Sequence, residues 1–373
     1  MLLQATQQGM SCKNNCMNCN WPFLHKNFKQ FMHSPQQFIQ EQVFFKPLFN
    51  KFCSINLIIM KRFRKILKWT GIILLFIIIS VTALTATRQN QKFEAPYPAI
   101  KASTDSAVIA RGKHLVFSIA HCADCHSSQN VDSLLQLGIE PSLSGGFKFE
   151  LPIGNIYARN ITSDKETGIG NLSDAEIART LYYGVGSDGR AMFDFMPFHN
   201  VSESDMQAII SYIRTQKPVK HKVPENEFNV MGKVVKAFML KPTGPNGTIP
   251  KTITPDSSAA YGSYLVNYVG NCAGCHTQRD AMTGAYIGPH MAGGNVFAEP
   301  GKDTLISPNL TPDESGRLNG WNFELFKNRF RKGKLIKHTH MPWDTYKHMT
   351  DDELKAIYNY LQTIEPAKMP AAK

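Results

Sequence analysis

The pentapeptide Cys122-Ala123-Asp124-Cys125-His126 has a counterpart, Cys272-Ala273-Gly274-Cys275-His276, 150 residues further along the chain. In each string two cysteines three positions apart precede a histidine, the pattern that attaches haem c covalently. Thiols at this spacing lie on one side of a helical turn and reach the two vinyl groups of the porphyrin, while the histidine faces the iron. We therefore expect two haem c cofactors, bound covalently by Cys122, Cys125, Cys272 and Cys275, with His126 and His276 as axial iron ligands.

Chance and zinc are the alternative interpretations of these strings. With eight cysteines and twelve histidines in the chain, only about 0.006 such strings are expected by accident. Zinc prefers clusters of four Cys or His ligands, and a second Cys pair is missing from both regions. Two haem attachment strings are the better interpretation.

The surroundings of the two strings repeat as well. Gly112 through His126 matches Gly262 through His276 at a constant offset of 150, with seven identical positions. Downstream, Pro141-Ser-Leu-Ser-Gly145-Gly146 parallels Pro289-His-Met-Ala-Gly293-Gly294, and Asn160-Ile-Thr162 parallels Asn309-Leu-Thr311. One ancestral module thus occurs twice.

Each module is expected to end in a closing helix. Ser202 with Asp205, and Thr350 with Glu353, have capping-box spacing at the start of two apolar-periodic segments. Few stretches suggest strands, so we predict a mainly α protein with two tandem domains, over 100–216 and 257–366. Residues 217–256 have the composition of a Pro-rich linker, with one short helix expected over Gly232–Leu240.

Most of the net positive charge of the chain lies in residues 1–68. Residues 1–68 hold ten Lys or Arg and one acidic residue, whereas residues 69–373 hold 31 basic and 28 acidic residues. The folded part is near neutral, so nucleic-acid binding has little electrostatic support and no nucleic-acid partner is expected.

A membrane anchor is predicted within residues 60–90. From Trp69 to Thr87 run 19 uncharged residues, close to the ~20 needed to cross the hydrocarbon core. Five basic residues lie between Lys61 and Lys68, and such a flank stays in the cytoplasm, so the domains are expected on the periplasmic side of the cytoplasmic membrane. A cleaved signal peptide is the alternative, because small residues follow the apolar run.

Residues 1–59 are expected to be a non-native or disordered extension. They show no sustained helical period, and Met60-Lys-Arg-Phe-Arg resembles the beginning of an export signal, so translation is expected to start at Met60. A cytosolic metal site at Cys12, Cys16 and Cys19 is the alternative, but no fourth ligand at zinc-like spacing is evident.

Methionine is the usual sixth ligand in electron-carrying cytochromes because its thioether raises the potential. Met196-Pro197 and Met341-Pro342 occupy corresponding places in the two modules, so Met196 and Met341 are predicted to complete the iron coordination. Methionines also fill gaps in cores. The remaining candidates are Met192, Met206 and Met349, with His199, His338 and His340 as competing histidines.

Four further residues are candidates for positions around the haem. The carbonyls of Pro141 and Pro289 are proposed acceptors of the Nδ1 proton of His126 and His276, which would fix the tautomer; a simple turn proline explains them equally well. Asn160 and Asn309 are proposed to hydrogen-bond haem propionates or the Met loop, and a turn-forming role is the alternative.

The string Gly154-Asn-Ile-Tyr157-Ala-Arg-Asn160-Ile-Thr162-Ser-Asp164-Lys-Glu-Thr167-Gly168-Ile-Gly170, followed by Met196-Pro197, resembles the cytochrome c subunits of membrane-bound alcohol and aldehyde dehydrogenases. The resemblance covers about residues 105–366. It implies class I cytochrome c folds, His/Met axial ligation, and transfer of electrons from a periplasmic dehydrogenase toward quinone or oxidase. Those alcohol dehydrogenase subunits carry three haems and lack an N-terminal anchor of this kind, whereas this chain has two attachment strings.

Three functions remain to be distinguished. The first is electron transfer between a periplasmic dehydrogenase and a respiratory acceptor, without catalytic activity of the chain itself. The second is a two-haem, peroxidase-like enzyme with one open iron site, against which the two Met-Pro landmarks argue. The third is a fixed subunit of a larger complex, which differs from the first only in its partner.

Overall fold

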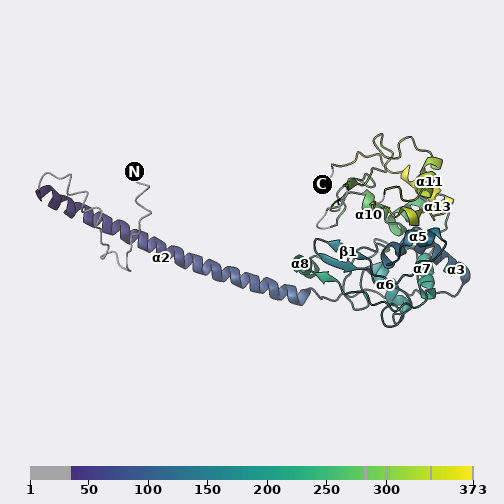
Figure 1. Cartoon of the computed structure of the whole chain (residues 1–373), viewed down its shortest axis with the longest axis horizontal. Coiled ribbons are helices and arrows are strands. Elements are labelled where there is room, and N and C mark those ends of the chain that lie inside the picture. Colours follow the sequence, from purple (N-terminus) through teal and green to yellow (C-terminus); the bar gives the residue numbers. More distant parts are fainter. Residues whose placement is uncertain (1–34, 281–283, 299–300, 302, 337, 372–373) are drawn as a thin grey trace. The chain divides into compact units, whose positions relative to one another are not determined.

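The computed structural model describes residues 35–280, 284–298, 301, 303–336 and 338–371, with side chains described from residue 59 onward except that of Asp132 (Figure 1). The chain forms two compact units that divide between Ala83 and Leu84. Cys12, Cys16 and Cys19 lie outside the described residues. The predicted extension 1–59 and the predicted start at Met60 therefore stay predictions.

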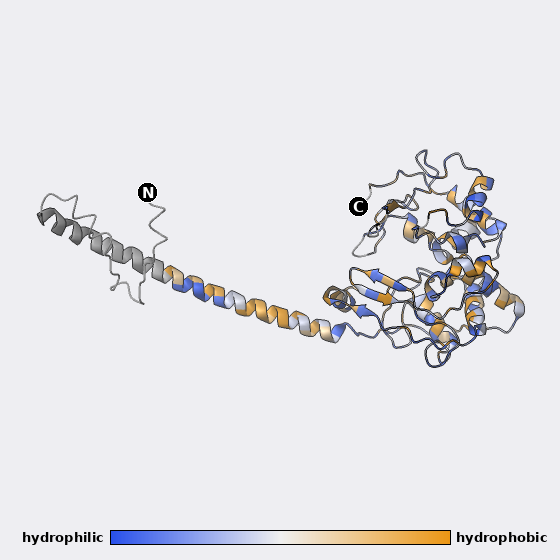
Figure 2. Cartoon of the chain, viewed as in Figure 1, coloured by the Kyte–Doolittle hydropathy of each residue, from blue (hydrophilic) through white to orange (hydrophobic). Residues whose placement is uncertain are grey.

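The first unit is described as part of one helix, α2 (Pro35–Arg88). Within it the stretch Ile59–Arg88 is, among the described residues, the helix long and apolar enough to cross a membrane. Figure 2 shows its basic residues as a blue stretch that is followed by the apolar run. The predicted anchor segment is thus a continuous helix, as a single span requires.

The second unit holds both modules, and each module is built on two crossing helices. In the first, α3 (Ser106–Phe117) crosses α7 (Glu203–Thr215), and in the second, α9 (Ala259–Tyr264) crosses α13 (Asp351–Leu361). A Cβ atom on Gly112 or Gly262 would collide with the carbonyl of Ala208 or Ala356 across the crossing. The identical glycine of the repeat is explained by this close backbone approach.

The other helices of the first module are α4 (Cys122–His126), α5 (Val131–Gln136) and α6 (Asp174–Tyr183), and α8 (Val230–Phe238) lies in the stretch between the modules. In the second module, α9 continues as the π-helix η2 (Leu265–Val269), followed by α10 (Cys272–His276), α11 (Phe323–Arg331) and α12 (Trp343–Tyr346). Helices dominate, which confirms the predicted mainly α class.

Short antiparallel strands complete the unit. Strands β1 (Lys148–Leu151), β2 (Gly154–Tyr157) and β3 (Glu227–Phe228) form one sheet in the order β1-β2-β3, with Phe149 opposite Ile156 and Asn155 opposite Glu227. Strands β4 (Val296–Phe297) and β5 (Leu305–Ile306) pair in the second module.

The stretch predicted as a linker, 217–256, is packed on the first module. It supplies β3 to the sheet, and the carbonyl of Val219 accepts a hydrogen bond from Asn160 Nδ2 at 2.8 Å. His221 Nδ1 donates to the carbonyl of Ser144 at 2.8 Å. The helix expected over Gly232–Leu240 is present as α8, two residues earlier. Proline content indicated irregular chain here, but it carried no information about these tertiary hydrogen bonds.

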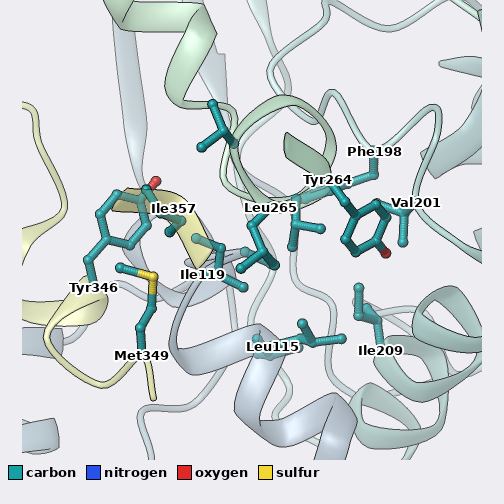
Figure 3. Packing of buried hydrophobic residues seen from close by; sticks show 14 of the residues in the cluster. Leu115, Ile119, Phe198, Val201, Ile209, Tyr264, Leu265, Tyr346, Met349 and Ile357 are labelled. Carbon is teal, nitrogen blue, oxygen red and sulfur yellow. The ribbon is translucent and has the colours of Figure 1, made fainter. Parts of the chain in front are cut away.

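The two modules share one hydrophobic core. Leu115, Ile119 and Ile209 of the first module belong to the same buried cluster as Leu265 and Ile357 of the second. Figure 3 shows these side chains, which come from both modules, lying close together. Because burial of a Leu or Ile side chain contributes about 1.5–3 kcal/mol, the modules stabilise each other.

Polar contacts between the modules follow the internal repeat. Arg111 corresponds to Tyr261, and the two meet directly, with the guanidinium donating to the phenol oxygen at 2.9 Å. Arg111 also pairs with Asp205 at 3.0 Å in its own module and with Glu353 at 3.3 Å in the other. Both carboxylates are buried, so each needs this partner.

A reciprocal pair flanks that contact. His114 of the first module lies 2.8 Å from Glu353, and its counterpart Tyr264 donates to Asp205 at 2.9 Å. Thr350 and Glu353 form the predicted capping box. Ser202 caps α7 through the backbone N–H of Asp205, whose carboxylate contacts Arg111 and Tyr264. The capping-box spacing predicted that the side chain of Asp205 would cap α7. Instead its carboxylate binds Arg111 and, across the interface, Tyr264.

Candidate functional site

Both attachment strings form one helical turn, α4 and α10, with the same backbone geometry. Each turn begins after a residue in the left-handed region, His121 (φ 39°) in the first module and Asn271 (φ 49°) in the second. A left-handed residue at this point redirects the chain sharply into the short helix. The thiols of Cys122, Cys125, Cys272 and Cys275 are not joined in disulfides.

The haem-facing histidines are held through Nδ1 by a backbone carbonyl. His126 Nδ1 donates to the carbonyl of Arg159 at 2.7 Å, and His276 Nδ1 donates to that of Pro308 at 3.1 Å. Burial lowers the pKa of both imidazoles, so each is neutral. With Nδ1 protonated, Nε2 carries the free lone pair that iron needs.

The prediction that Pro141 and Pro289 supply these carbonyls is therefore wrong. Each Nδ1–H has a single acceptor, a carbonyl in a later loop. This carbonyl lies 33 residues after His126 in the first module and 32 residues after His276 in the second. Pro141 itself is buried four residues before Gly145, and Ala292 N–H donates to the carbonyl of Pro289. The turn alternative therefore describes Pro289, whereas Pro141 remains a buried proline without an assigned turn.

Two glycines hold the carbonyl loop against the histidine. Gly145 (φ 74°) donates its N–H to the carbonyl of His126 at 2.7 Å, and a Cβ there would lie 2.5 Å from the carbonyl carbon of Arg159. In the second module Gly293 (φ 74°) makes the same bond to His276 and packs on Pro308. A side chain at either position would displace the acceptor of the imidazole proton.

Asn160 and Asn309 fix the same loops from the other side. Asn160 Oδ1 accepts from the backbone and hydroxyl of Thr162, and Asn309 Oδ1 accepts likewise from Thr311. Their Nδ2 groups donate to the carbonyls of Val219 and Ala367, at 2.8 and 2.7 Å. These bonds match the turn-forming alternative, and both amides anchor the loop beside the carbonyl that orients the haem histidine.

The two Met-Pro segments share one backbone turn. The carbonyl of Met196 accepts from Phe198 N–H, and that of Met341 accepts from Trp343 N–H, both at 2.8 Å. Both methionine side chains are half-buried against the core. Met206 and Met349 are fully buried inside that core. Met192 lines the same small cavity as Met196.

The competing histidines differ between the modules. His199 uses both nitrogens, with Nδ1 donating to the carbonyl of Tyr182 at 2.7 Å and Nε2 paired with Asp194 at 3.0 Å. Burial opposes protonation of His199, but Asp194 outweighs it and raises the pKa. His340 is exposed and lies against Phe297. In the described part of the second module, His338 Nε2 is buried without a hydrogen-bond partner, three residues before Met341.

The donor set fits covalent haem and does not fit zinc. Burial raises the pKa of the Cys122 and Cys272 thiols to about 12, so both are neutral here. Within the part of the chain that the structure describes, no group of three or more His, Cys, Asp or Glu could hold a metal ion by itself. A neutral thiol pair beside an oriented imidazole suits thioether attachment with one axial nitrogen.

The cytochrome c family model matches residues 109–217 and 259–365, together more than half of the chain. The chain belongs to the cytochrome c family. Each matched region contains one attachment string and one Met-Pro segment. The cytochrome carries two haem c groups, as the two strings predict.

Relatives of the cytochrome include subunits of dehydrogenases. It is 30% identical over 283 residues to the cytochrome c subunit of a quinone alcohol dehydrogenase from Gluconacetobacter polyoxogenes, covering 70% of this chain and 57% of the relative. It is 25% identical over 310 residues to the fructose dehydrogenase cytochrome subunit of Gluconobacter japonicus, covering 78% and 58%.

A further relative is a diheme cytochrome c-type protein of Cereibacter sphaeroides, 25% identical over 213 residues, which are 54% of this chain and 67% of the relative. The chain spans between half and two thirds of the length of the alcohol dehydrogenase subunits that it matches. The similarity confirms the resemblance to dehydrogenase cytochrome subunits.

The two haem-binding turns of the cytochrome meet at helix α12. Thr345 Oγ1 donates to both carboxylate oxygens of Asp124, inside the first attachment string, at 2.8 and 3.0 Å. The next residue, Tyr346, donates its hydroxyl to the carbonyl of Gly270, two residues before Cys272, at 2.7 Å. Its ring also packs edge-on to His121, with centroids 5.5 Å apart. One short helix thus contacts both attachment segments.

Sequence reasoning missed these α12 residues and the carbonyls of Arg159 and Pro308. For the carbonyls a signal existed, since each lies directly before the Asn-x-Thr landmark that both modules share. For Thr345 and Tyr346 we find no signal, because their partners Asp124 and Gly270 lie 221 and 76 residues away in the sequence.

Proposed function

We propose that this cytochrome relays electrons from a membrane-bound dehydrogenase on the periplasmic side of the membrane to a respiratory acceptor. Electron transfer itself follows from the family and from two haem c groups, whose irons supply one-electron oxidation and reduction. The direction, the location and the partners are the parts we propose. The relatives named as dehydrogenase cytochrome subunits support a dehydrogenase as donor.

The contact of α12 with both attachment segments carries the proposal. A relay needs its two redox groups held at a fixed and short separation, and buried contacts fix distances better than a flexible linker does. Asp124–Thr345 joins the first attachment string to α12, and Tyr346–Gly270 joins α12 to the residues just before the second string, so α12 links the two segments. The shared core and the paired carboxylates around Arg111 keep the modules from moving apart.

The residues of each module have defined tasks in this function. Cys122, Cys125, Cys272 and Cys275 hold the cofactors. The carbonyls that accept from His126 and His276 orient each imidazole, and burial keeps it neutral. Met196 and Met341 are the proposed sixth ligands. Filling the sixth position excludes substrates from iron, which disfavours the peroxidase-like alternative.

We further propose that α2 is an uncleaved anchor, with Lys61 to Lys68 on the cytoplasmic side. Protease added to spheroplasts tests the location. Cleavage of the haem domains by external protease is expected, and full protection would contradict it.

The function is tested on the full chain purified from native membranes in mild detergent. Mass spectrometry is expected to find a dehydrogenase among its companions, and addition of that enzyme's substrate is expected to reduce both haems. Primary alcohols, aldehydes and hexoses form the first substrate panel. A preparation without a dehydrogenase, whose haems no substrate reduces, would refute the relay. Rapid carbon monoxide binding to the reduced protein would instead favour the enzyme with an open iron.

A further inference from the structure

We propose that α8 is a second membrane contact, whose apolar face inserts into the lipid headgroup region on the side of the membrane that holds the haem domains. The proposal rests on α2 being a membrane anchor, as proposed above. It concerns a helix in the stretch between the two modules, outside both regions that the family model matches.

Helix α8 presents apolar side chains to solvent. The exposed fractions are 79% for Val230, 60% for Met231, 40% for Phe238 and 46% for Met239. A soluble domain normally turns the apolar stripe of a helix toward its core. Here four large apolar groups, from both ends of a nine-residue helix, are left uncovered.

The opposite face of α8 is firmly attached to the sheet. Asn229 caps the helix through Gly232 N–H and donates from Nδ2 to the carbonyl of Pro152 at 2.8 Å. A Cβ on Gly232 would collide with the carbonyl of Ile153, so the helix backbone lies directly on the β1–β2 turn. Because this side is fixed, the exposed side cannot rotate inward.

The end of the apolar run lies at α8. The uncharged run ends at Thr87, and the next residue, Arg88, places its guanidinium 5.5 Å from the ring centroid of Phe238. Arg88 belongs to the same compact unit as α8. Phe93 N–H donates to the carbonyl of Gly189 at 2.8 Å, which ties the chain to that unit five residues later. Where Thr87 leaves the hydrocarbon, α8 is therefore within about one helix diameter, ~10 Å.

The charges of α8 suit a phospholipid surface. Lys233, Lys236 and Lys241 accompany the apolar groups, and no acidic residue occurs between Asn229 and Lys241. Apolar side chains beside lysines are the composition of helices that lie in the membrane interface. Such lysines also attract anionic headgroups. The closeness to the exit point of α2 favours lipid over a protein partner.

Photocrosslinking in nanodiscs tests the proposal. Sedimentation cannot, because α2 alone keeps the protein in the membrane. The photoreactive residue benzoylphenylalanine replaces Met231, or Val230 as a second position, in the full two-haem chain. The nanodiscs contain phosphatidylethanolamine and phosphatidylglycerol. Leu137, 73% exposed in the first module, is the matched control, and Ile77 in the apolar run of α2 is the control for the anchor.

Lipid adducts, detected by intact mass, are expected at position 231 in at least about tenfold excess over position 137, as insertion of an apolar face requires. If position 77 forms adducts but positions 230 and 231 do not, the anchor stands and the α8 contact is refuted. If position 77 forms none, the anchor fails and the α8 contact falls with it. Crosslinks from position 231 to a second copy of the chain would also overturn the proposal.

Discussion

Replacement of Gly145 by alanine is expected to disturb the first haem site through the backbone behind its histidine. At φ 74° an alanine is strained, by about 1–2 kcal/mol for the left-handed region. The new Cβ would also lie 2.5 Å from the carbonyl carbon of Arg159 and 2.6 Å from Asn160 N, both backbone atoms that cannot turn aside. The loop must then move, and its carbonyl is the acceptor for His126 Nδ1.

Gly138 provides a matched control for the strain. It has φ 71°, and a Cβ there meets nothing within 4 Å. Gly138→Ala should therefore show the conformational cost alone. Gly145→Ala should lose a further ~1–3 kcal/mol, the usual cost of overpacking. The difference between the two variants, measured as free energy of unfolding in guanidinium, isolates the displacement of the loop.

The haem potential supplies a second measurement. A carbonyl that accepts the Nδ1 proton makes the imidazole a stronger donor. Its displacement should weaken the donor, favour reduced iron and raise the potential of the first haem, while the second haem keeps its own. Redox potentiometry on the full chain measures both. Equal stability and equal potentials for the Gly145→Ala and Gly138→Ala proteins would refute the assignment of the Arg159 carbonyl.

Three other predictions concern the ligands and the interface. Met196→Ala and Met341→Ala should each remove part of the far-red band of oxidised, Met-ligated haem c, whereas Met206→Leu in the core should leave it; an unchanged spectrum in both alanine variants would reject the ligand assignment. Burial opposes ionisation of Glu353, but His114 and Arg111 hold its pKa below the usual 4.5, so its stabilising contribution is present above that pH and lost as the pH falls further. The free energy of unfolding should therefore fall less steeply with decreasing pH in Glu353→Gln than in the wild type. Glu365→Gln should behave like the wild type. Identical pH profiles for the wild type and Glu353→Gln would contradict this. Thr345→Val removes both hydrogen bonds to Asp124 and should cost about 1–3 kcal/mol in unfolding experiments and slow electron transfer between the haems, whereas exposed Thr363→Val should do neither.

The cysteines and histidines of the site could be predicted because the porphyrin dictates their spacing within five residues. The carbonyl that accepts from each histidine could not, because any residue has a carbonyl and its position depends on a loop more than 30 residues away. Glycine and asparagine nevertheless carry that information indirectly. Gly145 is required because its backbone touches that of Arg159, and Asn160 is required because its amide hydrogen-bonds the loop to Val219.

The mainly α class and the order of helices could also be predicted, since capping residues and apolar periods act locally. The packing of residues 217–256 on the first module could not. Their prolines indicated irregular chain, but irregular chain becomes ordered when its carbonyls accept from buried side chains such as Asn160. Local sequence preferences do not contain such distant partners.

A comparison of the two copies distinguishes residues that shape each module from residues that join the modules. Where the copies agree, at Gly112 and Gly262 or at Asn160 and Asn309, the residues shape a module. Two positions at which they differ lie at the interface.

Arg111 has become Tyr261 in the second copy, and the two bond to each other. Asp124 has become Gly274, and only Asp124 has a carboxylate to receive Thr345. An interface between identical modules could form in two equivalent ways, but these differences fit only one. Divergence at these positions therefore specifies which module faces which through α12.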